Sequence, residues 1–130
     1  MKVLVIKPEN KPQVQEIDGT LESMQSLVGG TIQAIYPFED QVALICNDEG
    51  KLLQLPMNRA LRDGEIGKTF DILCGTVFLC GAPAEEPCFT DLSEEQIQKY
   101  TEMFYYPEYF WKTNQGMIIL RMEQSGDMSR

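Results

Sequence analysis

The chain has 130 residues, of which 20 are acidic and 11 are basic, and it contains no histidine. A net charge of −9 opposes nonspecific binding to DNA, RNA or anionic lipid, so we expect neither direct nucleic-acid binding nor a membrane partner. Without histidine, Ser-His and Cys-His catalysis are excluded. This length predicts a single domain over residues 1–122, followed by a polar tail over 123–130.

Apolar patterning in the first third of the chain predicts four strands and one short helix. The strands are expected at residues 2–7, 13–17, 31–36 and 42–46. The spacing of apolar residues after Thr20 predicts an amphipathic helix that ends at Gly29. The run from Val42 to Cys46 is apolar throughout, which is typical of a central strand buried on both faces.

The segment that follows this central strand predicts a hairpin and then a helical turn. Residues 47–50 read Asn-Asp-Glu-Gly, a turn sequence, so residues 42–46 and 51–55 are expected to pair as a hairpin. Asn58 is then expected to cap a short helical turn on which Arg59 and Arg62 share a face.

The second half of the chain predicts two more strands and the best-defined helix. Residues 70–80 form an apolar run that Gly75 interrupts, which predicts a strand with a bulge. Ser93 and Gln96 make a capping box that opens a helix over residues 94–104. A last strand is expected at residues 117–122. The sum is an α+β fold, with one mainly antiparallel sheet of about six to seven strands and two helices packed on it.

The first candidate binding site is the group Asn58, Arg59 and Arg62. Two arginines beside an amide can hold an anionic group through paired hydrogen bonds. The alternative is structural, with both arginines pairing with nearby acids such as Asp63 or Glu65 and bracing the loop.

The second candidate is an acidic, aromatic-edged surface between residues 85 and 111. Between residues 85 and 108 there are seven acids against one base, the steepest charge asymmetry in the chain. Such a surface can meet a basic groove on another protein, and tyrosines are enriched at binding hot spots. The alternative is a solvated helix face beside aromatics that close the core. The predicted binding residues are Glu94, Glu95, Glu102, Tyr105 and Tyr109, and the predicted core aromatics are Phe104, Tyr106, Phe110 and Trp111.

The cysteines and the N-terminus give no sign of a metal, a cofactor or a targeting signal. The spacing of Cys46, Cys74, Cys80 and Cys88 does not match the usual zinc knuckles, so we expect free thiols and no metal. No cofactor is predicted. The apolar run at the N-terminus is too short for a signal peptide, and we expect a cytoplasmic protein.

Several blocks of the sequence together resemble the family known as domain of unknown function 3846. The most distinctive block is Pro56-Met57-Asn58-Arg59-Ala60, and the similarity is clearest over residues 1 to about 80. Members of that family are carried largely by phages and conjugative elements, often near genes thought to counter host defences. The resemblance therefore implies an accessory role on a mobile element, and it assigns no catalytic residue. The other blocks that carry it are residues 27–32, 43–52 and 75–79.

Two functions remain open on these observations. The first is a small acidic, non-enzymatic binding protein that blocks a host defence protein, for example a CRISPR or restriction nuclease with a basic nucleic-acid-binding surface. The second is a small-molecule binder that sequesters a nucleotide signal through Asn58, Arg59 and Arg62.

Overall fold

The computed structural model describes residues 1–63 and 67–122, which form nine strands and two helices and confirm the α+β class. The expected tail over residues 123–130 lies outside the described residues. The helices are α1 (Leu21–Val28) and α2 (Glu94–Met103). The strands are β1 (Lys2–Ile6), β2 (Gln13–Glu16), β3 (Ile32–Ile35), β4 (Val42–Asn47), β5 (Met57–Arg62), β6 (Thr69–Cys74), β7 (Val77–Gly81), β8 (Glu108–Thr113) and β9 (Gly116–Arg121).

The main sheet contains five strands in the order β2-β1-β7-β4-β3, and every neighbouring pair is antiparallel. The mainly antiparallel character is thus confirmed. The other four strands form two separate two-stranded sheets, β5–β6 and β8–β9. The interior position predicted for residues 42–46 is confirmed, because β4 lies between β7 and β3.

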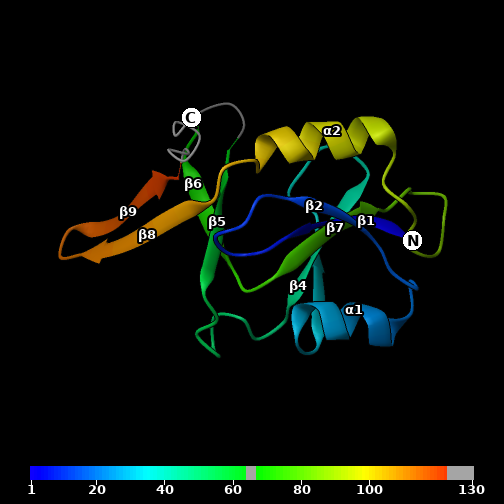
Figure 1. The fold of residues 1–130 in the computed structure, drawn as a ribbon, viewed down its shortest axis with the longest axis horizontal. Coiled ribbons are helices and arrows are strands. Elements are labelled where there is room, and N and C mark those ends of the chain that lie inside the picture. The colour runs from blue at the N-terminus through cyan, green and yellow to red at the C-terminus, as the bar shows by residue number, and fades with distance from the viewer. Residues whose placement is uncertain (64–66, 123–130) are drawn as a thin grey trace.

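Two apolar clusters cover the opposite faces of this sheet. On one face, Leu44 and its neighbours pack against Leu61 of β5 and Tyr100 of α2. On the other face, Ile45 and its neighbours pack against Met24 and other residues of α1. Figure 1 shows the resulting layers, with α2 above the sheet and α1 below it. Burial on both faces explains why residues 42–46 of β4 are apolar throughout rather than alternating.

Helix α1 ends at the glycine that the sequence predicts, and α2 begins with the predicted capping box. The Thr20 hydroxyl accepts the Ser23 N–H at 3.1 Å at the start of α1, and Gly29 ends that helix with a φ of 81°. At the start of α2, the Ser93 hydroxyl accepts the Gln96 N–H at 3.1 Å, and Gln96 Oε1 accepts the Ser93 N–H at 2.9 Å. Within the described part of the chain, neither helix has the length and apolar character needed to cross a membrane.

The expected hairpin partner of β4 is wrong. Residues 51–54 form turns, and the Leu52 side chain is 78% exposed. The expected helical turn after Pro56 is also wrong, because that segment is β5, which pairs with β6 through contacts such as Ala60 with Ile72. Pairing with a strand distant in sequence overrides the local capping signal of Asn58. On a strand, Arg59 and Arg62 lie on opposite faces, not on a shared one.

The strand predicted over residues 70–80 divides into two strands at Gly75. This glycine has a φ of 82°, and a Cβ atom at this position would lie 2.8 Å from Leu55 Cδ1. Glycine is therefore the residue that fits both the backbone conformation and the space. The break sends β6 to pair with β5 and lets β7 enter the main sheet between β1 and β4.

Candidate functional site

Asn58 and Arg59 are buried at the junction between β5, the β1–β2 turn and the end of α2. The Asn58 amide nitrogen donates to the Ile6 carbonyl at 2.9 Å and to the Gly75 carbonyl at 2.8 Å. Its Oδ1 accepts Arg59 Nη1 at 2.9 Å. The amide group of Asn58 therefore joins β1, β5 and the turn before β7.

The Arg59 guanidinium is 1% exposed and is surrounded mainly by backbone carbonyls. Nε and Nη2 donate to the Phe104 carbonyl at 3.1 and 3.0 Å, and Nη2 also donates to the Asn10 carbonyl at 2.6 Å. A cation at the C-terminus of a helix interacts favourably with the helix dipole. Burial lowers the pKa of Arg59 to about 10, so the guanidinium stays charged at neutral pH.

Arg62 contacts Glu108, an acid that the sequence did not suggest as its partner; Glu65, one of the two expected acids, lies outside the described residues. Arg62 Nη1 lies 2.9 Å from Glu108 Oε2, and the carboxylate is almost completely buried. Glu108 Oε1 accepts the Ala60 N–H at 2.9 Å. The carboxylate thus ties β8 to β5. These contacts support a structural role for Asn58 and Arg59. Backbone carbonyls and the Asn58 side-chain oxygen, and not the acidic side chains that the sequence suggested, accept the hydrogen bonds of Arg59.

Strands β8 and β9 form a two-stranded ribbon, defined here as residues 108–121, which projects from the rest of the molecule (Figure 1). The register pairs Tyr109 with Leu120 and Trp111 with Ile118. Because side chains alternate between the faces of a strand, these four lie on the same face of the ribbon. We call them the apolar face.

Each residue of the apolar face is about half exposed or more. Trp111 is 62% exposed and Tyr109 54%, while Ile118 and Leu120 are also solvent-exposed. The exposure expected for Tyr109 is confirmed, and the core position expected for Trp111 is wrong. The missed signal is the sequence from Tyr109 to Leu120, in which two short runs rich in aromatic and β-branched residues are joined by a tight turn that contains glycine.

The acids proposed for binding lie on the outer side of α2. Glu94, Glu95 and Glu102 are all exposed, and Glu94 Oε2 lies 3.4 Å from Lys2 Nζ. Tyr105 is 37% exposed, and its hydroxyl accepts Lys11 Nζ at 3.1 Å. The structure separates the two parts of the predicted surface, because α2 lies over the sheet and the ribbon extends beyond the end of that helix (Figure 1).

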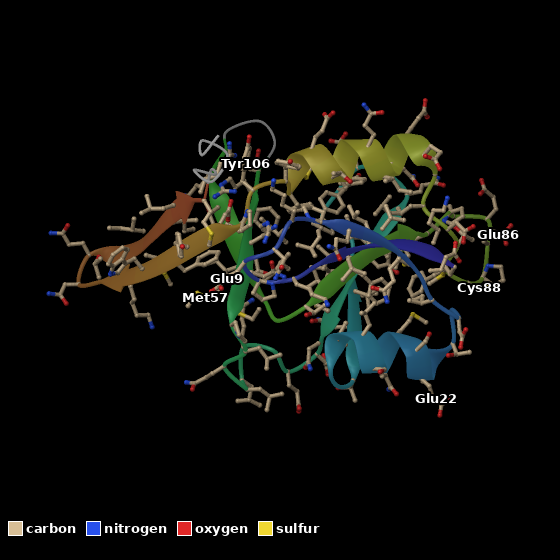
Figure 2. The ribbon with its side chains drawn as sticks, in the orientation of Figure 1. Glu9, Glu22, Met57, Glu86, Cys88 and Tyr106 are labelled. Carbon is tan, nitrogen blue, oxygen red and sulfur yellow. The ribbon has the colours of Figure 1, made fainter. Side chains whose placement is uncertain are left out.

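All four cysteines are free, and Cys88 is the exposed one. Cys88 and Glu86 lie in a loop at the end of the molecule opposite the ribbon (Figure 2). Burial raises the pKa of Cys80 to about 12, which disfavours the reactive thiolate. Among the described residues, no three His, Cys, Asp or Glu side chains are grouped to hold a metal ion.

Comparison with family models matches residues 1–105 to "Domain of unknown function (DUF3846)". The chain belongs to the DUF3846 family. The comparisons with curated proteins and with solved structures gave no match. The matched DUF3846 segment contains the whole five-stranded sheet, the β5–β6 pair, both helices and the Asn58–Arg59 junction. It ends before β8, so the ribbon and its apolar face follow the segment that defines the family match.

Proposed function

We propose that this chain is a non-enzymatic binding protein that docks on a basic partner protein through the apolar face of the ribbon. The observation that carries the proposal is the exposure of Tyr109, Trp111, Ile118 and Leu120 on one side of a projecting two-stranded sheet. Exposed apolar patches of this kind mark interaction sites, and a two-stranded sheet gains stability when another surface covers it.

The acids of α2 supply the second part of the proposal. A partner with a basic surface would be attracted over a distance by the net charge of −9 and by the exposed acids of α2. Exposed ion pairs contribute only about 0–1 kcal/mol each, so affinity would come from the aromatic side chains. The family context makes a host defence protein the first partner to test, and the proposed role is that of an inhibitor encoded by a mobile element.

The nucleotide-binding alternative has less support. It requires Asn58, Arg59 and Arg62 to offer donors to a ligand. The Arg59 guanidinium is buried against the carbonyls of Phe104 and Asn10, and Arg62 is paired with Glu108.

The replacement Trp111→Ser is expected to remove partner binding. Trp111 is the largest side chain of the apolar face, and truncation of a hot-spot residue costs about 2 kcal/mol or more, so dissociation should become about 30-fold faster. Tagged wild-type and variant proteins are used to capture proteins from a host lysate, and the captured partner is purified for binding kinetics. Tyr36→Ser is the matched control, because Tyr36 is 61% exposed and lies outside the ribbon. Equal capture by all three proteins would refute docking through the apolar face.

Reversal of the α2 acids is expected to slow association instead. A variant with Glu94, Glu95 and Glu102 changed to Lys should associate about tenfold more slowly at low salt, with little change in dissociation. The difference should shrink as salt is added. A matched control changes Glu22, Asp48 and Glu49 to Lys; all three are exposed, and Glu22 lies on α1, on the opposite side of the sheet (Figure 2). If both triple variants associate at the same rate, α2 has no special steering role.

A further inference from the structure

The outer edge of β9 carries backbone groups that face away from β8. The Met122 N–H donates to the Pro107 carbonyl at 2.7 Å, which continues the β8–β9 ladder by one pair. Since N–H groups point to alternate sides along a strand, those of Leu120 and Ile118 also face β8. The N–H and C=O groups of Met117 and Ile119 then point away from β8. Within residues 1–63 and 67–122, no backbone group bonds to them.

This edge lacks the features that protect the edge of the main sheet. The edge strand β2 reads Gln-Val-Gln-Glu, follows Pro12 and is polar at three of its four positions. The corresponding part of β9, residues 117–120, reads Met-Ile-Ile-Leu, without a charge or a proline. Exposed apolar edge strands of this kind are templates for pairing with another strand, and proteins usually block them with charges, prolines or bulges.

We propose that β9 of one copy of this chain pairs antiparallel with β9 of a second copy, which joins the two ribbons into one four-stranded sheet. The distribution of charge favours a second copy of the chain as the partner of this edge. The chain as a whole carries −9, yet residues 108–121 contain Lys112 and Arg121 against the single acid Glu108, which is buried. Two copies can therefore approach through their ribbons while their acidic α2 helices stay apart. The apolar, uncharged edge complements a second edge of the same composition.

The two-fold symmetry of such a pair restricts the register. The backbone groups of Met117, Ile119 and Arg121 face outward, and the register placed here sets the two uncharged residues against each other, Met117 of one copy with Ile119 of the other and the reverse. Ile118 then lies directly opposite its equivalent in a position without hydrogen bonds, where the Cα atoms are about 4.5 Å apart. Both copies place their apolar faces on the same side of the joined sheet.

This inference goes beyond the proposed function, because it concerns the edge of the ribbon and not its face. Trp111 lies on β8, one strand away from the pairing edge. Pairing would double the apolar face that is offered to a partner and would turn a two-stranded ribbon into a four-stranded sheet, which is a more stable unit.

Sedimentation equilibrium of the full chain tests the pairing. Across protein concentrations from about 1 to about 300 μM, the mean mass should rise from 14.8 kDa toward twice that value. Ile119→Pro removes an outward N–H while leaving the β8 ladder intact, as proline is tolerated at such edge positions. Two symmetry-related bonds are lost, so the dimer Kd should rise about 30-fold or more. Trp111→Ser should dimerise like the wild type.

Cysteine crosslinking tests the register independently of the proline variant. In a Cys88→Ser background, which removes the exposed native thiol, Ile118→Cys should form an intermolecular disulfide under mild oxidation. Leu120→Cys is the matched control. In this register the two Leu120 positions are four residues apart along the strands, about 13 Å, so no disulfide should form.

Three results would overturn the proposal. The first is a constant mass of 14.8 kDa over the whole concentration range. The second is continued growth beyond a dimer, which indicates open-ended aggregation. The third is efficient crosslinking by Leu120→Cys but not by Ile118→Cys. If the protein stays monomeric and captures a partner protein, and Ile119→Pro abolishes that capture, then the outer edge of β9 binds the partner protein and not a second copy. The proposed function would still hold in that case. If Trp111→Ser loses partner capture but still dimerises, the apolar face binds the partner and the pairing of β9 is unaffected.

Discussion

Replacement of Arg59 by alanine is expected to lower the free energy of unfolding by about 3–5 kcal/mol. The change leaves the Phe104 carbonyl and the Asn58 side-chain oxygen without their buried donors, and each unsatisfied buried group costs about 1–3 kcal/mol. It also empties the space of one of the largest fully buried side chains. Urea unfolding followed by circular dichroism measures the loss, which should appear as a lower midpoint with an unchanged slope.

Two variants show whether the donor geometry or the charge is responsible. Arg59→Lys keeps the charge but cannot place donors toward Phe104, Asn58 and Asn10 at once, so it should recover less than half of the loss. Arg62→Ala changes a side chain that is 38% exposed but removes the partner of the buried Glu108 carboxylate, so it should cost about 1–3 kcal/mol, less than Arg59→Ala. If Arg59→Ala is as stable as the wild type, the side chain has no structural role and the anion-binding hypothesis regains its support.

Features specified by short-range physics could be predicted from the sequence. Helix α2 begins at its predicted capping box and α1 ends at its predicted glycine, because these end signals are interactions between residues close in the sequence. The interior position of β4 followed from its unbroken apolar run. These predictions needed no knowledge of the partner segments.

Features specified by long-range pairing could not be predicted in the same way. Residues 57–62 form a strand because β6, which begins at Thr69, supplies the backbone partners. The local sequence after Pro56 contains an Asn at a capping position and therefore favours a helical turn. Likewise, the carbonyls around Arg59 come from Lys7, Asn10 and Phe104, up to 52 residues away. No spacing rule connects an arginine to carbonyls that distant in the sequence.

The predicted site residues also divide into those whose exposure depends on local structure and those whose burial depends on long-range contacts. The exposure of Glu94, Glu95 and Glu102 followed from helical periodicity. The burial of Asn58 and Arg59 depends on the contacts between three elements, and a single sequence read without a fold treats them as surface residues. Trp111 was predicted to be buried and is exposed. The density of aromatic residues around it suggested a core position, whereas the ribbon holds it at the surface.

Replacement of Leu44 by alanine is expected to destabilise the protein by about 2–5 kcal/mol, because the side chain is fully buried in β4 between Leu79 and Ile35. The cavity would lie beneath α2, where the sheet has no solvent-exposed side to relax toward. The matched control is Leu52→Ala, because Leu52 is 78% exposed and should cost less than about 0.5 kcal/mol. Equal losses for the two variants in thermal and urea unfolding would contradict the position of β4 inside the sheet.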